Sequence, residues 1–126
     1  MSLDITFYGK NGEVEPSTIE LSQDFYEKLI ESGFGEIGTS HKNKISIDGE
    51  EAEIDLVDLE KGKITNRDRF IDFFKEEIIE ESKNMLQSLG DSPSKEEYQT
   101  YYYPLKKFQE ILSYLENNKY QYLQRV

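Results

Sequence analysis

Apolar side chains recur at helical spacing over one long stretch, residues 65–89. They are three, four or seven positions apart, which places them on one side of a helix that turns once every 3.6 residues. These residues are Phe70, Phe73, Phe74, Ile78, Met85, Leu86 and Leu89. Thr65 followed by Asp68 resembles a capping box, and Gly90 stands where a helix commonly stops. The pattern therefore predicts a helix over 66–89 whose apolar side is buried.

The polar side of this predicted helix carries acids at intervals of four. They are Asp72, Glu76 and Glu80, with Glu77 and Glu81 beside them. Such spacing places like charge next to like charge along the helix. The usual interpretation is a solvated face, and we adopt it.

Apolar and polar side chains alternate in two other stretches, as is typical of β-strands. Residues 2–8 predict a short strand. Residues 43–57 predict a hairpin, because Asp48-Gly49 separates two alternating runs and is a strong turn signal. The apolar face of that hairpin would consist of Ile45, Ile47, Ala52, Ile54 and Leu56.

The other face of the predicted hairpin carries a row of acids. Its members are Glu51, Glu53 and Asp55, and Asp58 and Glu60 continue the acidic run. Lys44, opposite Glu53, would form the one favourable charged pair. Because neighbouring like charges cost roughly a few tenths of a kcal/mol per pair, we interpret this row as a binding surface.

Two further helical regions follow from shorter patterns. Residues 22–32 have apolar side chains at helical spacing after a serine that can cap the helix. Ser94, followed three positions later by Glu97, marks a second start, and Pro104 predicts either a kink or a new helix beginning there. Residues 34–43 are rich in Gly, Ser, Thr and Asn and predict a loop.

These elements predict one α+β domain over residues 1–126, a length that suits a single domain. We expect a small, mainly antiparallel sheet of three or four strands, including the 43–57 hairpin. The long helix 66–89 and the C-terminal helices would cover one face of the sheet and pack against each other.

Charge is the clearest compositional feature of the chain. It has 26 acidic and 15 basic residues, a formal net charge of −11. Residues 1–63 contain 15 acids and 6 bases, a net of −9, whereas residues 64–126 contain 11 and 9, a net of −2. Such a field repels nucleic acid and anionic lipid and favours basic partners. The alternative is that the acidity serves solubility alone.

The sequence lacks the residues of several common chemistries. It contains no cysteine, which excludes disulfides, thiolate zinc sites and thiol nucleophiles. It shows no basic leader and no long apolar run, so we expect a soluble, cytoplasmic protein. His41 is the only histidine, and residues 33–38 have G-x-G-x-x-G spacing but follow a helix instead of a strand. We therefore predict no catalytic, cofactor or metal site.

Seven of the nine tyrosines lie in residues 98–126. Those at 98, 101, 102 and 103 cover too many directions of a helix to be buried together. Exposed tyrosines suit protein recognition, so we add Tyr101 and Tyr102 to the predicted binding residues. The alternative is that they fill the space between helix and sheet with their hydroxyls outward.

This profile predicts a non-enzymatic protein that binds a basic partner. It is typical of a bacterial immunity protein or antitoxin that covers the active site of a basic, nuclease-like toxin. The predicted contact residues are Glu51, Glu53, Asp55, Asp58, Glu60, Tyr101 and Tyr102. Direct binding to nucleic acid or membrane is not expected. Two alternatives stay open: a phage-type inhibitor or DNA mimic, and a small-ligand or enzymatic domain with a pocket around His41.

Overall fold

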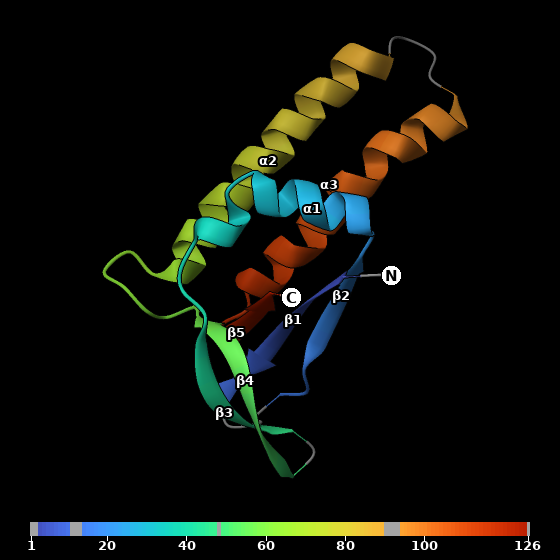
Figure 1. Ribbon diagram of the computed structural model, residues 1–126. Coiled ribbons are helices and arrows are strands. Elements are labelled where there is room, and N and C mark those ends of the chain that lie inside the picture. Colours follow the sequence, from blue (N-terminus) through green and yellow to red (C-terminus); the bar gives the residue numbers. More distant parts are fainter. Residues whose placement is uncertain (1–2, 11–13, 48, 90–93, 126) are drawn as a thin grey trace.

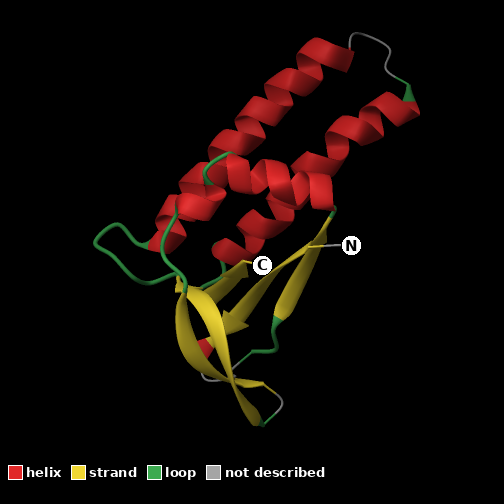
Figure 2. Ribbon diagram, viewed as in Figure 1, coloured by secondary structure: helices red, strands yellow, loops and turns green. Residues whose placement is uncertain are grey.

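A five-stranded antiparallel sheet with helices on one face forms the framework of the molecule (Figures 1 and 2). The computed structural model describes residues 3–10, 14–47, 49–89 and 94–125. Its elements in chain order are β1 (Leu3–Gly9), β2 (Ser17–Leu21), α1 (Gln23–Glu31), a 3-10 helix (Phe34–Glu36), β3 (His41–Ile47), β4 (Glu50–Asp58), α2 (Asn66–Leu89), α3 (Lys95–Leu115) and β5 (Tyr120–Arg125).

The α+β class is confirmed, but the predicted strand count of three or four is wrong. The two strands that sequence analysis missed are β2 and β5. In β2 the alternation was present, because Ile19 and Leu21 are buried while Thr18 and Glu20 are exposed. It is five residues long and follows a proline, so its local signal is weak.

The last strand of the chain lies in the middle of the sheet. The strand order is β2-β1-β5-β4-β3, so β5 pairs with β1 on one side and with β4 on the other. Its pairing with β4 involves only Val57 and Asp58. The rest of the β3–β4 hairpin therefore extends beyond the sheet, at the bottom of Figure 1.

The hairpin has the predicted register. Ile45 lies opposite Ala52, and Lys44 lies opposite Glu53. Gly49 has a φ of +82°, which a residue without a β-carbon adopts without strain, whereas Asp48 lies outside the described residues. The first strand of the hairpin, β3, begins at His41, two residues earlier than predicted. The predicted loop over residues 34–43 is therefore shorter.

The main core lies between the sheet and the helices. Phe34, Phe70 and Phe74 are fully buried, and the Phe34 ring centroid lies 5.3 Å from that of Phe70 and 5.5 Å from that of Phe74. The predicted burial of one whole side of α2 is wrong for its last turns, because Leu86 is 75% exposed. This end of α2 extends past α1 and the sheet, and only α3 lies beside it (Figure 1).

Side-chain caps begin the helices where the sequence predicted them. The Thr65 hydroxyl accepts a hydrogen bond from the Asp68 N–H at 3.2 Å, and the Ser94 hydroxyl accepts one from the Glu97 N–H at 3.1 Å. Each cap satisfies one of the free N–H groups of a first turn. Gly90, the predicted stop of the long helix, lies outside the described residues.

Pro104 does not begin a new helix, because α3 runs through it from Lys95 to Leu115. A proline inside a helix leaves the carbonyl four positions earlier without its donor. Here that carbonyl belongs to Thr100, an exposed residue, so water can supply the missing hydrogen bond. The C-terminal region is thus a single helix that packs antiparallel to α2 (Figure 1).

Two partly or fully buried arginines join segments that are distant in sequence. The guanidinium of Arg125 donates to the carbonyls of Phe34 at 2.6 Å and Ile37 at 2.8 Å, and it lies 5.7 Å from the Phe70 ring centroid. The segment with G-x-G-x-x-G spacing therefore folds around the end of β5. Arg67 has the corresponding role at the start of α2. It donates to Glu60, to the carbonyl of Leu115, the last residue of α3, and to the carbonyl of Asn117 beyond it.

A smaller apolar cluster lies on the sheet face opposite the helices. Tyr8, Ile45 and Leu56 are buried there. Ile47, Ile54 and Tyr122 pack against them. The apolar face predicted for the hairpin thus contacts the sheet, which leaves the acidic face of β4 turned away from this cluster.

Candidate functional site

The predicted acidic row lies on one exposed face of the β3–β4 hairpin. The acids are Glu51, Glu53 and Asp55, and the β3 residues opposite them are Ser46, Lys44 and Lys42. Every second residue of a strand lies on the same face, so this face continues to Val57, which is buried in the main core. The row therefore runs from the helix-covered side of the sheet out along the protruding hairpin.

The row is only partly balanced by nearby lysines. Lys44 lies opposite Glu53 as predicted, and Lys42 also lies opposite Asp55, because β3 begins before residue 43, the predicted start of the hairpin. Among the described residues, the ion pairs within 4.0 Å are Arg67–Glu60 and Lys107–Glu110, and neither lies in this row. Three carboxylates thus face two ammonium groups without a direct contact.

Asp58 and Glu60 do not continue the row. Asp58 lies on the opposite face of β4 from Asp55, and its carboxylate accepts a hydrogen bond from the Glu60 N–H at 3.0 Å. The Glu60 carboxylate accepts two hydrogen bonds from Arg67, at 2.7 and 3.0 Å. Both carboxylates therefore already have hydrogen-bond partners within the molecule.

Tyr101 and Tyr102 belong to the N-terminal half of α3, in the helical layer, whereas the hairpin extends from the sheet away from the helices (Figure 1). The two side chains also serve different surfaces. Tyr102 is 45% exposed and borders a groove between α2 and α3, whereas Tyr101 lines a cavity that also involves α1. The structure therefore divides the predicted binding residues among separate surfaces.

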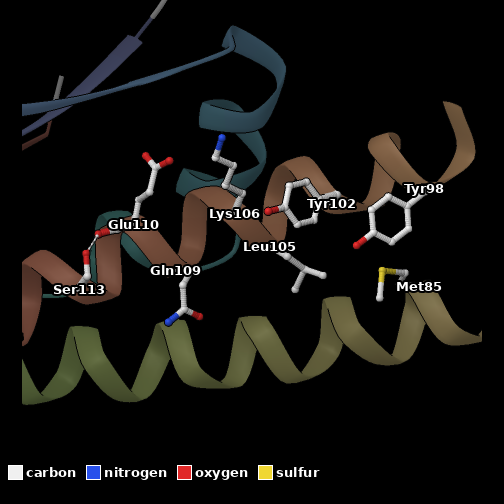
Figure 3. Close-up of a pocket in the computed structure, with 8 residues that line it drawn as sticks. All are labelled: Met85, Tyr98, Tyr102, Leu105, Lys106, Gln109, Glu110 and Ser113. Atoms are coloured by element: carbon white, nitrogen blue, oxygen red, sulfur yellow. Dashed lines mark hydrogen bonds between the residues drawn. The ribbon is translucent and has the colours of Figure 1, made fainter. Parts of the chain in front are cut away.

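The groove between α2 and α3 has a volume of about 480 Å³ and mainly apolar walls. The rings of Tyr98 and Tyr102 are stacked with centroids 5.6 Å apart, and Met85 reaches toward Tyr98 from α2 (Figure 3). Figure 3 also shows Leu105 pointing toward α2, while Lys106 points away from it. The polar groups at this groove do not converge on a common point.

The second cavity lies between α1, α2 and α3 and has a volume of about 560 Å³. Its apolar and aromatic walls are formed by Phe25, Leu29, Tyr101, Tyr103, Pro104 and Phe108. The Phe25 ring centroid lies 5.5 Å from that of Tyr103 and 5.3 Å from that of Phe108. The Tyr103 hydroxyl accepts a hydrogen bond from the Ser22 N–H at 3.1 Å, which holds this wall against the start of α1.

Acidic residues from two helices line this second cavity. Asp24 comes from α1, Glu77 and Glu81 come from α2, and Lys28 is the one base in the lining. Within the described part of the chain, none of the three acids forms a hydrogen bond or ion pair through its carboxylate. Burial raises the pKa of Glu77, and the neighbouring negative charges of Glu81, Glu80 and Glu76 raise it further.

This cavity was not predicted from the sequence, in which Glu77 and Glu81, four residues apart, were expected on a solvated face. Both are only partly exposed, and Asp24 of α1 lines the same cavity. The one signal in the sequence was the stacking of like charges along α2, and the position of α1 depends on tertiary packing.

His41 is exposed at the start of β3, opposite Leu56. Neither His41 nor Asp55 lines the two cavities described above. Over the described ranges, no three His, Asp or Glu side chains come together as a group that could hold a metal ion. No helix in those ranges combines the length and apolar character needed to cross a membrane.

A scan against protein-family models, a search of curated proteins and a search of solved structures each gave no match. Function is therefore inferred from the geometry and the charges of the chain itself.

Proposed function

We propose that this chain is a non-enzymatic protein that binds a basic partner protein through the acidic row Glu51, Glu53 and Asp55. One observation carries the proposal: these three exposed carboxylates lie on a hairpin that extends beyond the sheet, and they have no ion-pair contact among the described residues. The formal net charge of −11 supports it, because the field of the whole molecule attracts a cationic protein.

The shape and the charge of the hairpin favour an inhibitor of the immunity-protein or antitoxin type. A protruding acidic element can enter a basic active-site cleft, where it excludes an anionic substrate. Complementary charge steers such an encounter and raises the association rate more than it raises the affinity. The partner class we propose is a basic, nuclease-like toxin, and the setting is the bacterial cytoplasm.

The alternatives considered from the sequence receive less support. A DNA mimic presents carboxylates in place of phosphates, but Lys42 and Lys44 stand directly opposite the row, and a phosphate backbone carries no cations. A ligand site around His41 would need a cavity there, and the two cavities described above lie elsewhere.

The proposal is tested by capturing partners from the source cell with two matched triple variants. One carries Glu51→Ser, Glu53→Ser and Asp55→Ser, and the other carries Glu31→Ser, Glu36→Ser and Glu116→Ser, which removes the same charge from exposed positions elsewhere. A basic protein should bind the wild type and the control but not the hairpin variant. Equal capture by all three proteins, or capture that does not weaken between about 0.05 and about 0.5 M salt, would contradict the proposal.

A further inference from the structure

We propose that the cavity between α1, α2 and α3 binds an organic cation, an alkylammonium or guanidinium group, between carboxylates and aromatic rings. The site is separate from the acidic row and does not depend on the function proposed above. The cation can belong to a free amine or to a lysine or arginine side chain of a partner, and the experiment below distinguishes these sources.

The cavity has an excess of negative charge. Asp24, Glu77 and Glu81 line it, against Lys28 alone. Lys28 is exposed, and within the described part of the chain it forms no ion pair with any of the three acids. The pKa of Glu77 is raised first by its burial and then by repulsion from the neighbouring carboxylates of α2. A cation that enters relieves this repulsion and supplies the missing partners.

The aromatic walls favour an organic cation over a hydrated metal ion. Tyrosine and phenylalanine rings attract ammonium and guanidinium groups through the negative face of the ring. The Tyr103 ring already has a cation of the chain beside it, because the ammonium of Lys107, which does not line the cavity, lies 5.7 Å from its centroid. Tyr101 and Phe25 provide further aromatic surface in the same cavity.

The size and the rigidity of the cavity also fit a small ligand. Its volume of about 560 Å³ lies within the range of small-molecule sites, roughly 300–1,000 Å³. Contacts between Phe25, Tyr103 and Phe108, together with the hydrogen bond from Ser22, hold the aromatic wall in place. A preformed wall lowers the entropic cost of binding.

The test is titration of the purified, full-length protein with n-butylammonium and n-butylguanidinium, followed by NMR of the backbone amides. We expect saturable shifts confined to α1 and the facing parts of α2 and α3. Glu77→Gln and Glu81→Gln should each weaken binding about tenfold, the loss of one charge-assisted contact. Glu76→Gln and Glu80→Gln are the matched controls, because these exposed glutamates of the same helix do not line the cavity, and they should change binding less than about twofold.

Three outcomes would overturn the proposal: no saturable shifts at this site, equal weakening by control and cavity variants, or equal binding of neutral n-butanol. Tyr101→Leu provides a second variant that leaves the charge unchanged, and it should also weaken binding. A short peptide with one arginine and blocked ends identifies the source of the cation. Binding of this peptide at the cavity assigns a partner side chain, and binding of the free amines alone assigns a small molecule. The hairpin triple variant should bind the cations normally, so this site and the proposed function can fail independently.

Discussion

Arg67 provides the sharpest test of how the elements are held together. Its guanidinium is buried and donates to the Leu115 carbonyl at 2.6 Å and to the Tyr120 carbonyl. It also forms the ion pair with Glu60 at 2.7 Å. The residue therefore joins the start of α2 to the end of α3 and the start of the central strand β5. Replacing it with methionine keeps the apolar stem but removes every one of these donors.

The expected cost follows from these partners. A buried carbonyl left without a donor costs about 1–3 kcal/mol, and Arg67→Met removes the donor from at least the buried Leu115 carbonyl. The Glu60 side chain is 53% exposed, so the loss of its ion pair adds at most about 1 kcal/mol. Together these two contributions give an expected loss of about 1–4 kcal/mol of unfolding free energy, a substantial share of the roughly 5–15 kcal/mol of a typical domain.

Urea unfolding followed by circular dichroism measures this loss directly. Arg69→Met is the matched control, because Arg69 is exposed on the same turn and its hydrogen bond to Asn66 is long, at 3.5 Å. The control should change stability by less than about 0.5 kcal/mol. Glu60→Gln should cost about 1 kcal/mol or less. If Arg67→Met costs no more than Arg69→Met, the assignment of Arg67 as the joining residue is wrong.

Three further predictions concern pH, the core and the exposed end of the helix pair. The folded-state pKa of Glu77 is raised above its ordinary value of 4.5. The protonated carboxyl therefore favours folding, and this contribution to stability is fully present below pH 4.5 and is lost as the pH rises through the folded-state pKa. Glu77→Gln should therefore be more stable than the wild type at pH 7, with the difference closing toward pH 4 in thermal unfolding, whereas exposed Asp72→Asn should show a smaller gap. Leu123→Ala should cost about 2–5 kcal/mol in urea unfolding, because Leu123 is fully buried in the central strand, and a cost below 1 kcal/mol would contradict the central position of β5. Leu86→Ser should change stability by less than about 0.5 kcal/mol, because Leu86 is 75% exposed, and a large loss would show that its surface is covered in solution.

The elements that depend on nearby residues could be predicted from the sequence. The caps at Ser22, Thr65 and Ser94 act within one helical turn, and all three form as expected. The hairpin register also follows from a turn and two short alternating runs. In each case the interacting groups lie within about a dozen residues of each other, so the local pattern contains the information.

The sheet order could not be predicted, because it depends on contacts between the two ends of the chain. β5 pairs with β1 across more than a hundred positions, for example through Phe7 and Leu123. A six-residue segment rich in tyrosine and glutamine has no apolar face strong enough to indicate a central strand. The exposed end of α2 was missed for a related reason: periodicity shows which side of a helix is apolar, but not how far the neighbouring elements extend along it.

The candidate site was predictable in part. The acidic row lies on one exposed face as its alternation predicted, but the pairing of Lys42 with Asp55 depended on where the strand begins. The cavity was not predictable, because Asp24 and Glu77 are 53 positions apart in the sequence and line one cavity only through the tertiary packing of α1 and α2.

The most direct test of the proposed function is the association rate of the captured basic partner, measured at increasing salt for the wild type and for the Glu51→Ser, Glu53→Ser, Asp55→Ser variant. We expect the wild-type rate to fall steeply with salt, and we expect the variant to associate at least about tenfold more slowly at low salt with a weaker salt dependence. Equal rates and equal salt dependence for the two proteins would show that the acidic row of the hairpin does not bind the partner.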